Sequence, residues 1–293
     1  MNKKGMMGRA VTDVELLSVG EFSPVALLEK HSVLPLGMKK IALITEGLLE
    51  LMFPCCFSEK VNKKLGRMRK LKKIRSLLTE EINAAFLCQS AIDGLKLQAD
   101  SAAEISAKLL SSLAEIRRCL LRDAESIYKG DPAASSVFEV IISYPGFYAT
   151  AVYRIANRLY LMSVPLIPRM MTELAHRMTG IDIHPGALIG ESFFIDHGTG
   201  IVIGQTAEIG NRVKLYHGVT LGAHSFETDG FGNPIKSGKR HPTIGDDCTI
   251  YAGATILGGD TRIGDGSIIG SNVRLTKSLP PKSTIYYKGE NPT

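Results

Sequence analysis

An aliphatic residue returns at every sixth position through much of the C-terminal part of this 293-residue chain. The first series runs without a break through Ile183, Ile189, Ile195, Ile201, Ala207, Val213 and Val219. After a polar interruption the spacing resumes at Ile244, slips by one residue before Ile263 and continues to Leu275. A unit this short cannot bury its apolar side chain alone, whereas stacked units bury a continuous core. The spacing therefore predicts a parallel β-helix, with the aliphatic residues inside and glycine or small polar residues at the corners.

The chain before residue 181 has a different period. Apolar residues recur every three or four positions between residues 76 and 130, in a segment rich in Ala, Leu, Glu and Lys, which predicts helices. Thr79 suits the start of a helix and Gly130 its end. Pro145 suits the first turn of a further helix, and Gly180 suits the end of the last one.

These two periods define the expected organisation, which is of the α+β class. We expect an all-helical domain over residues 1–180 and a β-helix over residues 181–293. Three hexads make one coil, so residues 181–277 allow about four coils. The polar interruption is expected to protrude as a loop over residues 222–243.

The composition is that of a folded globular protein, with 44% hydrophobic and 22% charged residues. No apolar run reaches the roughly 18 residues that a membrane-spanning helix needs, and the N-terminus lacks the apolar segment of a signal peptide. The five cysteines are scattered, which argues against a disulfide framework. We expect a cytoplasmic protein.

Much of the net charge of +6 comes from one segment. Residues 60–75 carry nine Lys or Arg and no acid, and their apolar residues recur at helical spacing, which predicts a basic amphipathic helix. Such a helix is more often a solvated face than a binding surface. Because no RNA-binding aromatic pattern or zinc-finger spacing accompanies it, we expect neither a nucleic-acid nor a membrane partner.

Several motifs occur in a set order. The chain reads "GDPAASS" and "YPGFYATAVYRIANRLY" in its helical part, then "DIHPGALIG", "IDHGTGIVIGQTAEIG", "VTLGA" and "KRHPTIG" in its repeat part. Over residues 120–292 this set resembles the serine O-acetyltransferases of the left-handed hexapeptide-repeat acyltransferase family. The resemblance implies a left-handed β-helix and transfer of acetyl from acetyl-CoA to the hydroxyl of L-serine, the first step of cysteine biosynthesis.

The resemblance also implies partners. It predicts a homotrimer, or a dimer of trimers, with acetyl-CoA bound as co-substrate in the groove between neighbouring chains and no metal. L-Cysteine is expected to inhibit, because it has the same amino and carboxyl groups as serine. Family members carry a mobile tail ending in isoleucine that binds O-acetylserine sulfhydrylase, whereas this chain ends "YYKGENPT". We therefore expect no stable sulfhydrylase complex.

The candidate catalytic residues are His197 and Asp182. A serine hydroxyl attacks a thioester poorly unless its proton is removed, and histidine is the natural base near neutral pH. By resemblance His197 is that base, and Asp182 orients its ring and stabilises the imidazolium. No cysteine or serine matches a family nucleophile, so direct transfer is expected.

The candidate binding residues also follow from the resemblance. Asp131 and Asp196 are expected to bind the serine ammonium, and Arg240 the carboxylate, for which a planar guanidinium fork is well suited. His241 is expected against the hydroxyl or the developing negative charge. In the family the residues that match Arg240 and His241 come from the neighbouring subunit.

For the pantetheine arm of CoA the matching positions are Gly222, Ala223 and Ala252. The loop that follows is longer than the short loop of typical members. Lys236, Lys239 or Arg240 could meet the CoA phosphates there, and a solvated basic loop fits equally well.

Three other functions stay open at this point. Another hexapeptide acetyltransferase would use the same base on a different hydroxyl. A carbonic-anhydrase-like prism would need a three-histidine zinc site. The imidazoles that could supply it are those of His184, His197, His217, His224 and His241. A non-catalytic scaffold would leave the Asp and His set without a purpose.

Overall fold

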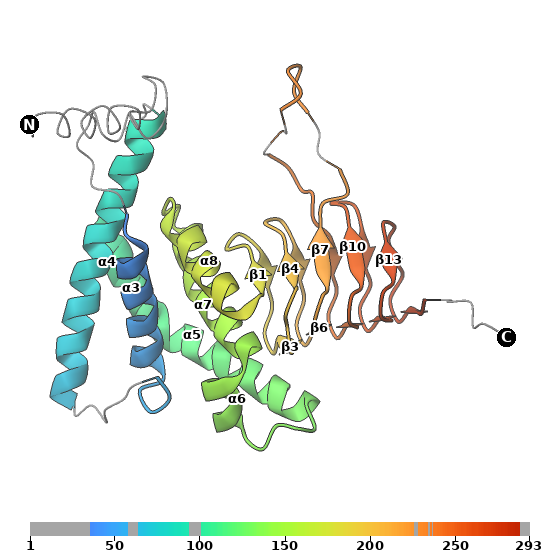
Figure 1. The fold of residues 1–293 in the computed structure, drawn as a ribbon, viewed down its shortest axis with the longest axis horizontal. Helices are drawn as coiled ribbons and strands as arrows, with labels where there is room; N and C mark the ends of the chain where they lie inside the picture. The colour runs from blue at the N-terminus through green and yellow to red at the C-terminus, as the bar shows by residue number, and fades with distance from the viewer. Residues whose placement is uncertain are drawn as a thin grey trace, which may run out of the picture.

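The computed structural model describes residues 36–57, 64–93, 101–225, 228–233, 235 and 237–287. Helices form the N-terminal part and a β-helix follows, with helices α5, α7 and α8 next to the first coil (Figure 1). The helices are α3 (Met38–Met52), α4 (Lys64–Asp93), α5 (Ala102–Gly130), α6 (Val137–Ser143), α7 (Pro145–Leu161) and α8 (Ile167–Thr179). None of these helices is long and apolar enough to cross a membrane.

Local sequence signals explain most of the helix ends. Helix α5 begins after a capping box in which Ser101 and Glu104 each bind the other's backbone N–H. Pro145 opens α7 at its first turn, and Gly180 closes α8 with a left-handed φ of 71°, as predicted. The predicted helix start at Thr79 is wrong: α4 continues through it, and the Thr79 hydroxyl donates to the Arg75 carbonyl within the helix.

The basic segment is helical from Lys64 onward, and residues 60–63 lie outside the described residues. The apolar side chains of this segment become more exposed towards the start of α4. Ile74 is 2% exposed, whereas Met68 is 49% and Leu65 is 65% exposed.

In the described part of the chain, fourteen short strands stack in parallel on the three faces of a prism. Face A carries β1 (Asp182–Ile183), β4 (Val202–Ile203), β7 (Thr220–Gly222), β10 (Thr255–Leu257) and β13 (Arg274–Leu275). Face B carries β2 (Leu188–Ile189), β5 (Glu208–Ile209), β8 (Thr243–Ile244) and β11 (Arg262–Ile263). Face C carries β3 (Phe194–Asp196), β6 (Lys214–Tyr216), β9 (Thr249–Ile250), β12 (Ile268–Ile269) and β14 (Thr284–Ile285).

The predicted parallel β-helix is confirmed, with about five coils rather than about four. The difference comes from the residues after Leu275. Leu279 forms a bridge to Ile263, and β14 pairs with β12, so the chain adds a partial coil that lacks the hexad spacing. Between β7 and β8 the chain leaves the prism as a long projecting loop (Figure 1). Residues 288–293, on which the expectation about the sulfhydrylase rests, lie outside the described residues.

The corner between faces C and A explains one set of glycines. Gly180, Gly200, Gly218 and Gly253 stack there with φ between 71° and 80°, and Asn272 completes the column at 59°. A Cβ on Gly218 would lie 3.4 Å from the Gly253 backbone. Glycine adopts this left-handed conformation without strain, so the column lets the chain enter each strand of face A through the same backbone turn, two residues before the strand.

Buried contacts fix the helices on the first coil. Asp123 of α5 is fully buried and accepts from the Arg154 guanidinium at 2.6 and 3.0 Å and from the Phe193 backbone N–H at 2.9 Å. Arg154 of α7 also donates to the Gly190 carbonyl at 2.7 Å. A buried charge is tolerated only when it is paired and hydrogen-bonded, so this network sets the position of both helices against the prism. The end of α5 is thereby held beside face C.

Candidate active site

His197 lies in a two-residue insertion at the corner between faces C and A. Asp182 pairs with Val202, twenty residues further on, whereas Val202 pairs with Thr220, only eighteen residues further on. The spacing from β1 to β2 and from β2 to β3 is six residues, so the two extra residues fall between β3 and β4. His197 itself has a left-handed φ of 54°, and its side chain is 75% exposed.

The sequence period conceals this insertion. Each hexad buries two residues, one in the strand and one two positions before it. A two-residue insertion therefore moves the sixfold series from one buried column to the other: Ile195 pairs with Leu215, but Ile201 lies two positions before its own strand residue Ile203. The unbroken sixfold series from Ile183 to Val219 therefore does not mean that all coils have the same number of residues.

Around His197 the structure gathers two carboxylates and a second imidazole. Its Nε2 lies 3.8 Å from Oδ1 of Asp196, which ends β3, and its ring centroid lies 5.8 Å from that of His217 on the next coil. Tyr216, opposite Asp196 in the sheet, stacks on Tyr251 at 5.0 Å. The His197 imidazole thus projects from the corner beside the Asp196 carboxylate and the His217 ring.

The other carboxylate is that of Asp131, the C-cap of α5. The hydroxyl of Tyr144 donates to its Oδ2 at 2.6 Å and the backbone N–H of Ala133 to its Oδ1 at 2.8 Å. These two hydrogen bonds, and the nearby charge of His197, lower the pKa of Asp131. The same hydrogen bond, with the charges of Asp131 and Asp196, raises the pKa of Tyr144 to about 12. Asp131 is therefore a fixed carboxylate near neutral pH.

Asp182 lies one coil below His197. Its neighbour Ile181 packs against Gly198, where a Cβ would be 2.4 Å from the Ile181 side chain. The ion pair recorded for the Asp182 carboxylate is with Arg169 of α8, at 3.5 Å, and not with His197. The structure thus brings the two predicted catalytic residues to adjacent coils without a direct contact.

Arg240 and His241 lie at a different corner, between faces A and B. The His241 ring packs directly on Gly204, where a Cβ would be 1.9 Å from the ring, so only glycine fits there. The Thr206 hydroxyl accepts from the backbone N–H of Arg240 at 3.0 Å and of His241 at 3.1 Å. One threonine at the end of face A therefore holds the arm of the long loop.

The tautomer of His241 follows from its contacts. The backbone N–H of Thr206 donates to its Nδ1 at 3.1 Å, and the Thr206 hydroxyl lies 2.8 Å from the same atom. Burial, with the charges of Arg240 and Lys239, lowers the pKa of His241 to about 4. The ring is therefore neutral near pH 7, with its proton on Nε2. It can donate a hydrogen bond but is a poor base.

Hydrogen bonds to two tyrosine hydroxyls of α7 and its N-cap relate the two parts of the candidate site. Tyr144, before the first residue of α7, binds Asp131, and Tyr160, in its last turn, binds Gln205 beside Arg240. Sixteen residues of α-helix span roughly 24 Å at 1.5 Å per residue. Within one chain Asp131 and Arg240 therefore lie beside opposite ends of helix α7.

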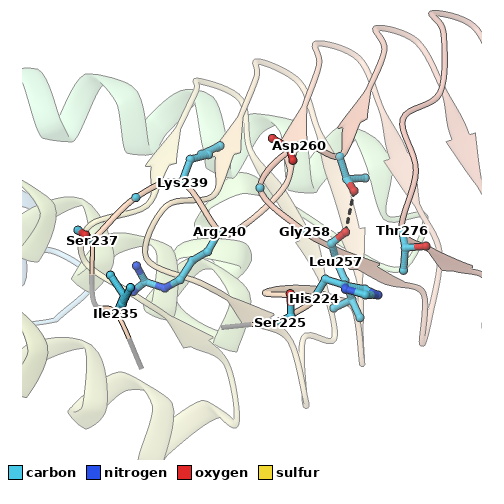
Figure 2. Close-up of a pocket in the computed structure, with 13 residues that line it drawn as sticks. His224, Ser225, Ile235, Ser237, Lys239, Arg240, Leu257, Gly258, Asp260 and Thr276 are labelled. Carbon is cyan, nitrogen blue, oxygen red and sulfur yellow. Dashed lines mark hydrogen bonds between the residues drawn. The ribbon is translucent and has the colours of Figure 1, made fainter. Parts of the chain in front are cut away.

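A cavity of about 420 Å³ lies at the base of the long loop. Lys239 and Arg240 reach it from the loop arm, and Leu257, Gly258 and Asp260 come from β10 and the turn after it (Figure 2). Gly222 is the strand partner of Leu257, and Ala223 follows it.

Ala252 lies apart from these residues, at the corner between faces C and A, where its carbonyl accepts from Asn272. Lys239 Nζ is held at 2.6 Å by the Thr206 carbonyl and at 3.1 Å by Glu208. Lys236 lies outside the described residues.

Among the described residues, one group of three potential metal ligands lies within 4.8 Å: Glu173, His176 and Asp182. Arg169 pairs with both carboxylates of this group. The Arg169 guanidinium already neutralises both carboxylates at the position that a cation would need. His184 lies outside this group, where its ring packs on Tyr160 and its Nδ1 accepts from the backbone N–H of Gly186. The described histidines therefore offer no three-histidine zinc geometry.

The comparisons with known proteins decide the family. A family model for bacterial transferase hexapeptides (six repeats) matches residues 241–277. The plasmid serine acetyltransferase of Synechococcus elongatus is 45% identical over 258 residues, which cover 84% of this chain and 80% of that protein. This chain belongs to the serine acetyltransferase family.

Solved structures of serine acetyltransferases agree with that assignment. Serine acetyltransferase 1 of Entamoeba histolytica, crystallised with L-cysteine, is 34% identical with a TM-score of 0.73, over 87% of this chain and 88% of that one. The Neisseria gonorrhoeae serine acetyltransferase, crystallised with serine, is 27% identical with a TM-score of 0.56, over 85% and 97%.

Sequence reasoning missed three residues of the candidate site: Tyr144, Gln205 and Thr206. Each acts on a predicted residue through a hydrogen bond that links positions far apart in the chain. Tyr144 precedes Pro145, where the sequence indicates only the start of a helix. The other two lie at an ordinary hexad corner, where the sequence carries no signal that distinguishes an anchor from a turn residue.

Proposed function

We propose that this chain transfers the acetyl group of acetyl-CoA to L-serine with His197 as the general base. The imidazole takes the hydroxyl proton as the serine oxygen attacks the thioester carbonyl carbon. The tetrahedral intermediate collapses, the carbon–sulfur bond breaks, and CoA leaves as a thiolate that is protonated on release. The products are O-acetyl-L-serine and CoA, and no acetyl-enzyme forms.

One observation supports this function most strongly. Two carboxylates, Asp131 and Asp196, flank the exposed imidazole of His197 at a single corner. Ammonium binding needs such a carboxylate pair, and its position beside a base brings the hydroxyl of the same amino acid to the imidazole. Asp182, on the coil below, would orient the ring once the bound substrate displaces the exposed side chain of His197 towards the prism.

The carboxylate of serine would bind Arg240, and its hydroxyl or the developing oxyanion would accept from Nε2–H of His241. Because Arg240 lies beside the opposite end of α7 from Asp131 in the same chain, Arg240 and His241 would come from a second copy. We infer a homotrimer, or a dimer of trimers, in which the corner between faces C and A of one chain meets the corner between faces A and B of the next. The helical domain over residues 1–180 would support this assembly.

Acetyl-CoA would lie along the same junction. Gly222 and Ala223 on one side and Ala252 on the other offer small side chains for the pantetheine arm, and the cavity beside Lys239 and Arg240 would accept phosphates. L-Cysteine, which is bound in the Entamoeba histolytica structure, would occupy the serine position here, because its amino and carboxyl groups match.

Thiol release from acetyl-CoA, measured with and without L-serine, tests the proposed function. We expect release that depends on serine and yields O-acetylserine. A higher kcat/KM with a sugar or antibiotic hydroxyl than with serine would contradict the acceptor assignment. Added L-cysteine should raise the apparent KM for serine without lowering kcat.

A further inference from the structure

Gln205 connects the end of helix α7 to Arg240. Its Oε1 accepts from Nη2 of Arg240, and its Nε2 donates to the Tyr160 hydroxyl at 2.7 Å. The amide oxygen thus accepts from a donor and the amide nitrogen donates to an acceptor, which fixes the orientation of the amide. Nothing in the mechanism above requires either Gln205 or Tyr160.

Tyr160 is a firm support for this chain of contacts. Its ring packs edge-on against His184, with centroids 5.8 Å apart at 85°, and against Gly186, where a Cβ would lie 2.9 Å from the ring. The residue is part of α7, which the buried Arg154–Asp123 pair fixes to the prism. The hydroxyl of Tyr160 is therefore positioned by the helical domain and not by the long loop.

Arg240 needs such a support. It extends from the arm of the long loop, and an arginine side chain that is not held in place loses rotamer freedom when it binds a ligand. The neutral Gln205 amide can hold one edge of the guanidinium without cancelling its charge. This bond uses one of the five N–H donors of a guanidinium.

We propose that Gln205 and Tyr160 are positioning residues that fix Arg240 for the carboxylate of the acceptor, and so make the enzyme select α-amino acids over hydroxyl compounds without a carboxylate. This inference rests on the proposed function. It also gives α7 a double role: its N-terminal end fixes the ammonium-binding Asp131 through Tyr144, and its C-terminal end fixes the carboxylate-binding Arg240.

The test compares two acceptors, L-serine and L-serinamide, which share the hydroxyl and the ammonium but differ in the carboxylate. For Gln205→Leu we expect KM for serine to rise about tenfold, the value of one hydrogen bond to a charged group, with kcat changed less. KM for serinamide should stay unchanged. Tyr160→Phe should give the same pattern with a smaller rise, of about threefold.

A variant outside the prism serves as the control. Gln89→Leu removes an amide that donates to Asp93 on the surface of helix α4, and it should change neither KM. Gel filtration and thermal melting of each variant confirm folding, and if Gln205→Leu does not fold, Tyr160→Phe carries the test.

An equal rise in both KM values, or no rise in either, would overturn the positioning role. Arg240→Leu separates this failure from a failure of the proposed function. If Arg240→Leu loses the preference for serine and Gln205→Leu does not, only the positioning inference is wrong. If Arg240→Leu keeps the preference, Arg240 does not bind the carboxylate, and both its assigned role and the positioning inference are wrong. The proposed function itself fails if the unaltered protein shows no serine-dependent thiol release.

Discussion

At the scale of single residues, the two histidines of the proposed site have opposite surroundings. His197 is exposed on a corner beside two carboxylates, whereas His241 is 8% exposed, with Nδ1 already accepting from Thr206. An exposed imidazole with a nearby carboxylate can take a proton and stay stable as an imidazolium. A buried neutral imidazole with its Nδ1 occupied can only donate from Nε2. The surroundings thus assign one base and one donor.

Replacing His197 by Ala should lower kcat by roughly 10²–10⁴-fold, the usual contribution of a general base. Because the side chain is exposed and outside the core, the variant should fold and assemble normally. Steady-state kinetics with gel filtration of the same sample measures both properties. Near-normal turnover in a correctly assembled protein would show that another group is the base.

Stability should fall in mild acid because of His184 and His241. Burial, with nearby Arg charges, lowers the pKa of each to about 4, against about 6.5 in an unfolded chain. Between these pH values the unfolded state binds more protons, so their contribution is complete above pH 6.5 and is lost as the pH falls towards 4.

Thermal midpoints measured between pH 7 and pH 4.5 check this expectation. The decline should be smaller in the double variant His184→Gln, His241→Gln, which keeps every carboxylate of the protein. An identical decline in both proteins would mean that carboxylates alone cause the acid sensitivity.

At the scale of elements, the repeat period predicted the architecture but not the irregular coil. The hexad spacing predicted the stacked parallel strands, because every coil buries aliphatic residues at fixed intervals. The period could not reveal the two-residue insertion at His197. A hexad there has one apolar residue in its strand and another two positions earlier, so the sixfold series passes from one kind of position to the other across the insertion. The final partial coil was missed because Leu279 follows Leu275 by four residues instead of six.

The junction of α5, α7 and the first coil depends on one buried ion pair. Asp123→Ala should lower the free energy of unfolding by about 3–5 kcal/mol, because it leaves the Arg154 guanidinium buried without its partner. Urea unfolding of the variant measures the loss. The matched control is Asp247→Ala, which removes a partner of Arg212 on the surface and should cost far less. Equal losses in the two variants would show that burial does not strengthen the Asp123–Arg154 pair.

At the scale of the whole molecule, the proposed site is divided between two ends of one helix. Asp131 and Asp196 belong to one corner of the prism and Arg240 to another, and α7 spans the distance between them. Sequence motifs predicted the residue types, and the resemblance to the family predicted that a neighbouring subunit supplies two of them. The supporting residues Tyr144, Gln205 and Thr206 could not be predicted, because their contacts depend on the folded path of the chain.

Mixing two inactive variants tests the central claim, that two copies of the chain complete each site. His197→Ala removes the base from one corner, and Arg240→Leu with His241→Asn removes the partner groups from the other. After unfolding together at equal concentrations and refolding, about one quarter of the junctions in a cyclic assembly should combine two intact corners. We predict recovery of about a quarter of wild-type activity in the mixture and none in either variant refolded alone. A mixture as inactive as its components, with assembly confirmed by gel filtration, would show that the site lies within a single chain.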